Sequence, residues 1–441
     1  MNRTPHILII GAGFAGLWAT RTLRDKNVRV TIIDRNNFHT FLPLLYQVGA
    51  AELEPEQIAY PIRTLIRNRP QIGYIRAEVK SLDCGNRKAL CNDQWIEFDY
   101  CLLAMGTITN YFGVPGAEKW SFPLKSLDDG IFLRNHILSC FEQASTCRSR
   151  EEQKSLLTFV VVGGGSTGIE FAGAVQELLK GPLKKDYAGL SPKDMRVVLV
   201  ESTGSVLNMM PEGLRAYALR KLRRMDVDVR LHARVERVTE EGISFADGQN
   251  LKSRTVIWTA GVSGPEILQK WDLPLGPGRR ILSRPSLQVQ GMEHVFVAGD
   301  LCFLAQDGVP LPQLAPVAVQ QGRTAARNML QLIQGREPIP FTYKDRGTMV
   351  TIGRNAAVAR IGRKDFKGFF AWFLWLAIHI MNLIGFRNRI FVMINWAWDY
   401  FFFERAARMI IPACCSSPGV WSCFRRRFLR KAGREEENGG V

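Results

Sequence analysis

The sequence lacks the cysteine and histidine patterns that mark several redox and metal-binding proteins. Its nine cysteines form no CxxC pair and its six histidines are dispersed. Zinc, iron–sulfur and disulfide-framework proteins are therefore not favoured, and no metal site is predicted. Low-complexity tracts are also absent, which favours compact globular domains over linkers or disorder. The short segment before the apolar residues 7–10 leaves no room for a leader peptide, and this predicts a cytoplasmic catalytic body.

Acidic residues are too few to balance the basic ones, and the formal net charge at pH 7 is +17. Such a charge indicates an anionic partner: a phosphate-bearing ligand, a nucleic acid or an acidic lipid surface. The hydrophobic fraction of 46% supports substantial cores, and the length of 441 residues predicts two or three domains.

One strand–glycine turn–helix–strand pattern is present twice. The first copy is GAGFAG at residues 11–16, followed by a helical pattern over residues 17–23 and by a strand ending at Asp34. The second copy is GGGSTG at residues 163–168, and its second strand ends at Glu201. The glycines of such a turn let backbone N–H groups approach a pyrophosphate, and the acid binds ribose hydroxyls. The sequence therefore predicts two dinucleotide-binding folds.

Further strands and one helix are expected to complete these folds. Buried strands are predicted over residues 100–104, 256–260 and 295–298, each followed by or ending near a glycine. A helix is predicted over residues 316–333, stopped by the glycine that follows. Residues 180–194, which are rich in glycine, proline and lysine, are interpreted as a surface loop.

The first fold is assigned to FAD and the second to a nicotinamide. Asp300, after Gly299, can accept a hydrogen bond from a ribityl hydroxyl, and the next helix can turn its positive N-terminus toward the flavin. The predicted FAD-binding residues are Gly11, Gly13, Phe14, Ala15, Gly16, Asp34, Arg35, Ala104, Gly106, Gly299, Asp300, Ala318 and Val319. The predicted NADH-binding residues are Gly163, Gly165, Ser166, Thr167, Gly168, Glu170, Glu201, Ala260 and Gly261.

Four polar residues receive more specific predictions. Glu201 occupies the place of the 2′-phosphate of NADP, so its charge predicts NADH rather than NADPH; the alternative is that it caps a turn. Glu170 is expected in the first helical turn, aimed at the nicotinamide cleft, with stabilisation of the helix dipole as the alternative. Gln320 and Gln321 are predicted beside the flavin, with ordinary helix-surface amides as the alternative. Glu170, Gln320 and Gln321 are the predicted catalytic residues.

A protein thiol relay is not expected. Disulfide reductases of this architecture carry a redox-active cysteine pair after the first glycine turn, whereas residues 38–60 contain no cysteine. Cys302 is the thiol nearest to a cofactor motif, and it is predicted to be a small buried residue. Electrons are therefore expected to pass from FAD directly to an acceptor.

The C-terminal part is rich first in aromatic residues and then in arginine. Residues 369–386 form an apolar stretch of roughly 27 Å as a helix, which is marginal for crossing a bilayer, and residues 390–403 form a shorter aromatic stretch. A segment lying on the membrane surface is favoured, with a spanning segment or a buried dimer interface as alternatives. Cys414 and Cys415 are candidates for acylation.

A basic tail favours an anionic lipid leaflet. A nucleic acid is the competing partner, but no recognition helix, RNP-like strand or aromatic platform accompanies the cluster. The basic residues of the tail are Arg425, Arg426, Arg427, Arg430, Lys431 and Arg434.

Together these residues resemble the type II NADH dehydrogenases, the single-subunit, non-proton-pumping NADH:quinone oxidoreductases of respiratory and photosynthetic membranes. The resemblance covers residues 1 to about 410 and leaves residues 180–194 and the tail unexplained. The matching segments are GAGFAGL (11–17), DRNNFHTFLPLLYQV (34–48), LKSLDD (124–129), VVGGGSTGIEFAG (161–173), VIWTAGV (256–262), VFVAGDL (295–301), LAPVAVQQG (314–322), GTMVTIGRNAAVA (347–359) and IGFRNRIFVMINWAWDYF (384–401).

The resemblance implies non-covalently bound FAD, contact of Glu170 with NADH near the nicotinamide, and entry of quinone from the membrane side. It places Gln320 and Gln321 in a segment next to the flavin. Many members have Ala-Gln where this sequence has Ala315 and Pro316, and that glutamine is associated with the quinone head group. Whether Gln320 or Gln321 takes its place is left open.

The predicted fold is α/β, with two Rossmann-like domains and a C-terminal membrane-associating helical region. The expected parts are an FAD-binding domain in two pieces (1–115 and 266–345), an NADH-binding domain (116–265), an anchoring region (346–410) and a basic tail expected to be disordered (411–441). The predicted enzyme passes a hydride from NADH to FAD and two electrons to a quinone, without proton pumping, at the cytoplasmic face of a membrane. The alternatives are a ferredoxin or rubredoxin reductase and an NADH-binding redox-sensing flavoprotein, and a homodimer is possible.

Overall fold

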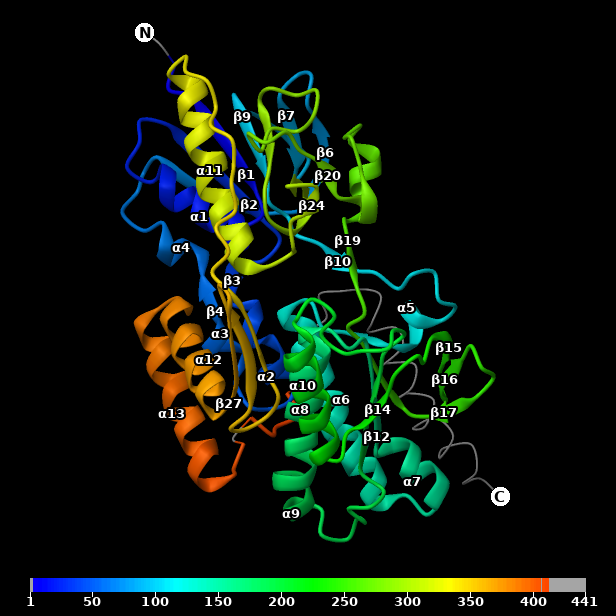
Figure 1. Cartoon of the computed structure of the whole chain (residues 1–441). Helices are drawn as coiled ribbons and strands as arrows, with labels where there is room; N and C mark the ends of the chain where they lie inside the picture. Colours follow the sequence, from blue (N-terminus) through cyan, green and yellow to red (C-terminus); the bar gives the residue numbers. More distant parts are fainter. Residues whose placement is uncertain (1–2, 406, 412–441) are drawn as a thin grey trace, which may run out of the picture.

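Two parallel sheets organise the chain in the computed structural model, which describes residues 3–405 and 407–411 (Figure 1). The first sheet has the strand order β21-β9-β1-β2-β5, and all its pairings are parallel. Its strands are β1 (His6–Ile10), β2 (Arg29–Asp34), β5 (Ile72–Arg76), β9 (Tyr100–Leu103) and β21 (Val295–Val297). The carboxyl ends of these strands, which precede predicted cofactor residues, therefore lie at one edge.

The second sheet repeats this arrangement with the order β11-β18-β12-β13-β14, again all parallel. Its strands are β11 (Phe122–Pro123), β12 (Thr158–Val162), β13 (Arg196–Val200), β14 (Asp228–Arg230) and β18 (Thr255–Trp258). The chain enters this domain after β9 and returns before β21. Two connecting strands, β10 (Ile108–Thr109) and β19 (Val262–Ser263), run antiparallel side by side, so the second domain is an insertion in the first.

Two helices pack closely beside the first sheet, α1 (Phe14–Leu23) and α11 (Ala315–Ile333). Figure 1 shows them side by side although about 300 residues separate them in the sequence. A Cβ on Gly322 would lie 2.1 Å from the carbonyl oxygen of Ala15, so glycine is required where the helices meet. The prediction of a helix over residues 316–333 is confirmed to within one residue.

The helices of the second domain include α6 (Leu127–Thr146), α7 (Arg150–Leu156), α8 (Ser166–Leu178) and α10 (Glu212–Arg224). The prediction of a loop over residues 180–194 is wrong for its first part. The chain continues from α8 through a π-helical turn (Leu179–Leu183) into α9 (Lys184–Asp186). Leu179 and Leu183 are buried in the core, and their burial outweighs the helix-breaking tendency of the glycine and proline between them.

Short elements join the first domain to the C-terminal region. They are β3 (Phe38–Thr40), β4 (Ala59–Pro61), α2 (Leu45–Gly49), α3 (Pro55–Ile58) and α4 (Ile62–Leu65). Small antiparallel sheets border the two parallel ones: β6 (Val79–Asp83), β7 (Lys88–Cys91) and β8 (Gln94–Glu97) in the first domain, and β15 (Val235–Thr239), β16 (Gly242–Phe245) and β17 (Asn250–Lys252) in the second. Residues 301–315 contain three short strands, β22 (Cys302–Phe303), β23 (Ala305–Gln306) and β24 (Val309–Pro310).

The C-terminal region is a three-stranded antiparallel sheet followed by two helices. The strands are β25 (Thr348–Thr351), β26 (Ala357–Ile361) and β27 (Lys364–Gly368), and the helices are α12 (Phe369–Asn382) and α13 (Phe386–Phe402). The prediction of one continuous segment over residues 369–386 is wrong. Gly385 has a φ of +89°, and the Arg389 guanidinium donates to the carbonyls of Leu383 and Met381, so α12 ends there and α13 starts in a new direction.

Two main hydrophobic clusters hold these parts together. One lies around the first sheet, and it includes the five strands of that sheet and the inner faces of α1 and α11. The other joins the second sheet to α2, α6 and α8, and it also takes in Trp375, Leu383 and Val392 from α12, the turn and α13. One side of each C-terminal helix therefore packs into the hydrophobic core.

Candidate active site

The first glycine turn excludes any larger residue at two of its positions. Gly11 has a φ of +104°, and a Cβ there would lie 2.4 Å from the carbonyl oxygen of Ala104. A Cβ on Gly16 would lie 1.8 Å from the Gly11 oxygen. In contrast, no atom lies within 4 Å of the place where Gly13 would carry a Cβ. That side of the turn is open to a pyrophosphate, as the pattern requires.

The second glycine turn has the same geometry. Gly163 has a φ of +111°, and its Cβ would lie 2.8 Å from the Cα of Ala260. A Cβ on Gly168 would lie 1.9 Å from the Gly163 oxygen, and the space beside Gly165 is again open within 4 Å. The two predicted nucleotide sites therefore rest on one repeated local structure.

Each strand-terminal acid binds the glycine turn of its own unit. The Asp34 carboxylate accepts from the backbone N–H of Ala12 at 2.6 Å, and burial raises the pKa of this carboxyl while that N–H opposes the shift. The Glu201 carboxylate accepts from the N–H of Gly164 at 2.7 Å and from the N–H of Thr203 at 2.8 Å. Both acids thus hold a turn, which is the alternative stated for Glu201, and the contact of Glu201 with a nucleotide stays a prediction.

The mouth of the second unit contains an aromatic residue that the sequence interpretation missed. A Cβ on Gly261 would lie 2.5 Å from the Phe112 ring, and this ring is 62% exposed. Ser166 and Thr167, both partly exposed, begin α8 on the same unit. Phe112 comes from the strand connection between the domains, some 150 residues from Gly261, and this distance in sequence is why no local pattern indicates it.

The flavin side is a close meeting of α1, α11 and a short 3-10 turn, Gly299–Leu301. Gly299 has a φ of +81°, and its Cβ would lie 3.4 Å from that of Ala15 and 3.6 Å from that of Ala318. Gly106, with a φ of +70°, has open space beside it. Among the other predicted FAD residues, two are half-buried and one is exposed: Phe14, Val319 and Arg35.

Asp300 forms an ion pair that the sequence interpretation did not anticipate. The Lys125 ammonium lies 3.1 Å from its carboxylate, and the Thr107 hydroxyl lies at 3.4 Å. The side chain of Gln313 donates to the Asp300 carbonyl at 3.0 Å. Lys125 stands in the LKSLDD segment, directly before the capping box that starts α6. This lysine brings a positive charge from the second domain to the flavin side of the first.

The two glutamines of α11 are engaged by backbone groups. The Gln321 side-chain oxygen accepts from the N–H of Gly299 at 2.8 Å, which fixes the 3-10 turn. The amide of Gln320 makes a two-way contact with Lys344, donating to its carbonyl at 2.9 Å and accepting from its N–H at 3.0 Å. Both side chains hold neighbouring segments in place.

His39 supplies a buried polar atom suited to a ligand. Its Nδ1 lies 2.9 Å from the carbonyl oxygen of Ala12, and its ring meets the Phe14 ring edge to face at 5.1 Å. Burial lowers the pKa of His39 to about 4, and within the described part of the chain its Nε2 has no hydrogen-bond partner. A neutral imidazole with a free nitrogen beside an open glycine turn fits an FAD site.

Glu170 lies between the second unit and the C-terminal region. It is the fifth residue of α8, so its expected place in the first helical turn is wrong. Its carboxylate accepts from the N–H of Thr351 at 3.4 Å, at the end of β25. Loss of solvent raises the pKa of Glu170 to about 8, while the Thr351 N–H and the Trp375 indole act in the opposite direction. The carboxyl is therefore largely protonated at pH 7.

Two hydrogen bonds through Gln47 link Tyr46 of α2 to Trp396 of α13. The side chain of Gln47 donates to the Tyr46 hydroxyl at 3.0 Å and accepts from the Trp396 indole at 2.9 Å. Burial, followed by the charge of Glu170, raises the pKa of Tyr46 well above its ordinary value. The buried Tyr46 hydroxyl therefore keeps its proton at the base of the C-terminal helices.

A buried arginine fastens the end of the described chain beneath the same helices. Arg405, only 2% exposed, lies 2.6 Å from the Glu52 carboxylate and 3.6 Å from that of Glu177. Its guanidinium also donates to the carbonyls of Ala50 and Ala174 at 2.8 Å. This cluster ties the segment after α13 to α2 in the first domain and to α8 in the second.

The outer faces of α12 and α13 are strongly apolar. Only Ala371 and Trp375 of α12 and Asn388 and Val392 of α13 are buried. The exposed large apolar residues of the two helices are Phe369, Phe370, Phe373, Ile378, Met381, Phe386, Ile390, Phe391, Met393, Ile394, Trp398, Phe401 and Phe402. An exposed patch of this extent is typical of a surface that another apolar phase covers.

Within residues 3–405 and 407–411, no helix combines the length and the apolar character needed to cross a bilayer. Cys414, Cys415 and the basic tail from Arg425 to Arg434 lie outside the described residues. Cys302 is buried, and burial raises its pKa to about 11, as expected for an unreactive thiol.

Two dinucleotide units, the second inserted in the first, define a two-domain flavoprotein of the nicotinamide-dependent oxidoreductase class. Residues 5–322 match the family described as pyridine nucleotide-disulphide oxidoreductase, and residues 346–405 match the NDH2 C-terminal domain. The second match assigns the C-terminal helices to one branch of that class. The chain belongs to the type II NADH:quinone oxidoreductases.

Several relatives support this assignment. A type II NADH:quinone oxidoreductase of Mycobacterium tuberculosis is 34% identical over 409 residues, which are 89% of this chain and 88% of the relative. The Staphylococcus aureus enzyme of the same name is 28% identical over 82% of this chain and 91% of its own. Among solved structures, NDH2 from Plasmodium falciparum in complex with NADH has a TM-score of 0.85 at 19% identity, covering 93% of this chain and all of the other.

Proposed function

We propose that the second unit of this chain binds NADH, that the first holds FAD, and that a quinone is reduced where α8 meets the C-terminal helices. When bound, FAD supplies the chemistry of the family, acceptance of a hydride from NADH and transfer of two electrons to quinone. The observation that carries the proposal is the position of Glu170. It lies on the helix that starts at the NADH glycine turn, and its carboxyl faces Thr351 and Trp375 of the C-terminal region.

The NADH site combines an open glycine turn with a negative charge. Gly165 and the N-terminus of α8 receive the pyrophosphate, and Ser166 and Thr167 add hydroxyl donors there. Glu201 accepts from ribose hydroxyls on its exposed side while its other contacts hold Gly164 and Thr203. A 2′-phosphate at this position meets the carboxylate charge, and NADH is therefore preferred over NADPH.

The FAD site is formed by the carboxyl edge of the first sheet. Gly13 leaves room for the pyrophosphate, Asp34 faces the ribose and the His39 Nε2 is available to a polar ligand atom. On the flavin side, Asp300 is placed for the ribityl chain and Lys125 provides a positive charge beside it. The N-terminus of α11, near Ala318, adds the favourable end of a helix dipole.

In this proposal Glu170 acts on the quinone side, in place of the expected contact with the nicotinamide, and supplies a proton during quinone reduction. A carboxyl with a pKa of about 8 holds its proton at neutral pH and releases it readily to a stronger base. Reduction of a quinone to a quinol consumes two protons, and Glu170 lies on the side from which a membrane-soluble molecule arrives. The buried hydroxyl of Tyr46 is coupled to it. Gln320 and Gln321 act by holding the flavin-side turns, through Lys344 and Gly299.

The apolar faces of α12 and α13 bind a membrane surface without crossing it. Two helices of 14 and 17 residues, each buried along one side only, expose aromatic and aliphatic side chains over most of their length. Such helices lie in the interface of a bilayer. We assign the protein to the cytoplasmic face, with the basic tail directed at anionic lipid. A homodimer stays a prediction, to be tested by light scattering in detergent.

A steady-state assay in liposomes tests this function. The full-length protein, loaded with FAD, is supplied with NADH or NADPH and with a panel of quinones of different head group and tail. The proposal expects NADH to be the better donor and quinone reduction to saturate. It is contradicted if NADH oxidation is independent of every quinone, which would favour a redox sensor, or if a ferredoxin-type protein is the better acceptor.

A further inference from the structure

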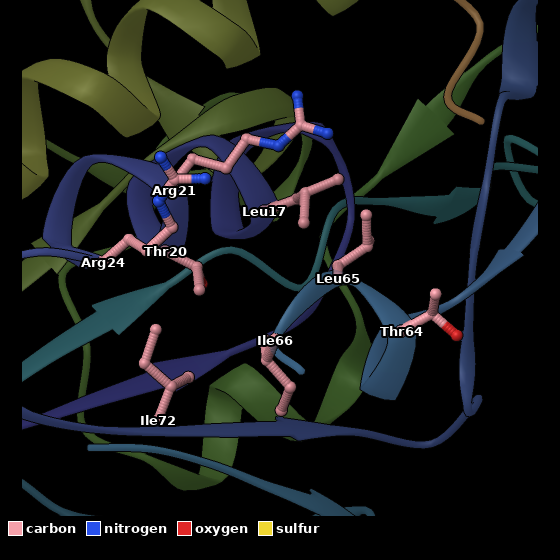
Figure 2. A pocket seen from close by; sticks show the side chains of 8 residues that line it. All are labelled: Leu17, Thr20, Arg21, Arg24, Thr64, Leu65, Ile66 and Ile72. Atoms are coloured by element: carbon pink, nitrogen blue, oxygen red, sulfur yellow. The ribbon is translucent and has the colours of Figure 1, made fainter. Parts of the chain in front are cut away.

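A pocket of about 430 Å³ lies between α1 and α4, outside the candidate active site. Eight residues line it: Leu17, Thr20, Arg21, Arg24, Thr64, Leu65, Ile66 and Ile72. Figure 2 shows the two arginines on the α1 side and the aliphatic side chains of Leu65, Ile66 and Ile72 across the space. The pocket faces the C-terminal half of α1, whereas the glycine turn stands at its N-terminus. Its size lies within the range of ligand sites, which is roughly 300–1,000 Å³.

Positive charge dominates the surroundings of this pocket. Burial lowers the pKa of Arg21, and the charges of Arg24, Arg323 and Arg389 lower it further. Among these neighbours, the Tyr60 hydroxyl acts in the opposite direction and raises the pKa of Arg21. A cation held among other cations is stabilised when an anion binds between them.

Two of these arginines, Arg21 and Arg323, lie over the indole ring of Trp18. The Arg21 and Arg323 guanidiniums lie 4.5 Å and 4.3 Å from the centre of the Trp18 ring. Arg24 has a carboxylate partner, Asp25, but both of these side chains are at least half exposed, so this pair is screened by solvent. The side of the pocket formed by Arg21 therefore keeps a net positive charge.

Two electrostatic neighbours of Arg21, Tyr60 and Arg389, lie at the turn between α12 and α13. Tyr60, which acts on Arg21, packs against Gly385 so closely that a Cβ there would lie 2.5 Å from its ring. Arg389, in the first turn of α13, is another neighbour of Arg21. The exposed apolar residues Phe386 and Ile390 lie at the start of α13, close to Arg389 in the sequence. A molecule with an anionic head in the pocket can therefore place an apolar tail along α13.

We propose that this pocket binds the phosphate head group of an anionic phospholipid, with Arg21 as its principal cation. Charged oxygens face the guanidiniums of α1, and the glycerol backbone lies against Leu65 and Ile66. The acyl chains follow the exposed face of α13 into the bilayer. The inference deepens the proposed membrane association, because it turns a general attraction to acidic lipid into one defined site.

Vesicle flotation of the full-length protein tests this site. Vesicles of phosphatidylcholine alone are compared with vesicles that also contain phosphatidylglycerol. Arg21→Gln is expected to weaken binding to the anionic vesicles about fivefold, the effect of one basic residue at such a surface, and to leave binding to the neutral ones unchanged. Arg21→Lys is expected to retain most of the preference. Turnover of NADH with a soluble quinone in detergent, together with the thermal midpoint, is expected to be the same for all variants.

Arg237→Gln is the matched control, because Arg237 is exposed on β15 of the second domain and its loss changes the net charge equally. Equal weakening by both variants would overturn the site in favour of the overall charge. An Arg21-dependent thermal shift with inorganic phosphate, without any Arg21-dependent lipid preference, would overturn it in favour of a free anion. If the wild type floats with neither vesicle while turnover persists, the membrane association itself is wrong and the oxidoreductase function stands.

Discussion

At the scale of single residues, the chemistry depends on a few carboxyl groups in contrasting surroundings. Asp34 and Glu201 are held by backbone N–H groups at the ends of their strands. Glu170 is instead half-buried, with one long hydrogen bond from Thr351 and no cation among the causes that shift its pKa. Under the proposed function, a carboxyl group therefore contacts a nucleotide at Asp34 and Glu201 and holds a proton at Glu170.

The raised pKa of Glu170 predicts how stability depends on pH. In the folded protein the pKa is about 8, whereas the ordinary value is 4.5. Between these values the folded chain keeps a proton that the unfolded chain has released, so the free energy of unfolding falls as pH rises, by up to about 1.4 kcal/mol per pH unit from this group. Urea unfolding of the wild type and Glu170→Gln at two pH values in this window measures the effect. The variant is expected to show the smaller loss at the higher pH, and an equal loss in both proteins would contradict the assignment.

Glu201 predicts the choice of nucleotide. Glu201→Gln keeps an oxygen that accepts from the Gly164 N–H and removes the charge that opposes a 2′-phosphate. We expect the ratio of kcat/KM for NADPH to that for NADH to rise by roughly tenfold, which corresponds to about 1.4 kcal/mol. Asp228→Asn, in the next strand of the same sheet, is the control for a lost carboxylate. An unchanged ratio in Glu201→Gln would show that this carboxylate does not set the preference.

At the scale of elements, local patterns account for much of the fold. The glycine turns, their strands and the helix over residues 316–333 could be predicted, because each depends on neighbours within a few residues. The break between α12 and α13 could not, because an apolar run continues through it. The positive φ of Gly385 and the contacts of Arg389 with Leu383 and Met381 decide it. Burial of Leu179 and Leu183 likewise decides the helical path after α8.

The exposed faces of α12 and α13 give a prediction for membrane binding. Phe386 and Phe401 are 78% and 72% exposed, so replacing both by serine is expected to leave the fold intact and to weaken vesicle binding by more than tenfold, from roughly 1.5–3 kcal/mol per buried Phe. Ile339→Ser, at a 55% exposed position in another region, is the control. Flotation with neutral vesicles measures the change. Undiminished flotation of the double variant would exclude these faces as the membrane contact.

At the scale of the whole molecule, long-range pairs bring the parts of the site together. Lys125 and Asp300 come from different domains, and Arg405 meets Glu52 across more than 350 residues. The candidate site could be predicted where a motif carries its own partner, as in the two glycine turns. It could not be predicted where the partner lies far away in the sequence, as with Lys125, His39 and Phe112. Glu170 was identified as a site residue, but its contacts with the C-terminal region depend on the complete fold.

A substitution of Arg405 tests how much its buried ion pairs stabilise the attachment of the C-terminal region. Arg405→Met removes the buried guanidinium that pairs with Glu52 and Glu177 beneath α12 and α13, and breaking a buried pair costs about 3–5 kcal/mol. The thermal midpoint is expected to drop by several degrees. Arg408→Met, which removes a more exposed pair with Asp186, is expected to cost about 0–1 kcal/mol. Similar midpoints for the two variants would mean that the cluster around Arg405 does not secure this region.

The most direct measurement separates the two half-reactions in Glu170→Gln by anaerobic rapid mixing. The central claim is that Glu170 acts on the quinone side of the site, as a proton donor near the C-terminal helices. NADH should therefore bleach the flavin at nearly the wild-type rate, whereas reoxidation by a soluble quinone should slow by roughly 10²-fold or more. Equal quinone rates in the wild type and the variant, or slowing confined to the NADH step, would contradict the account.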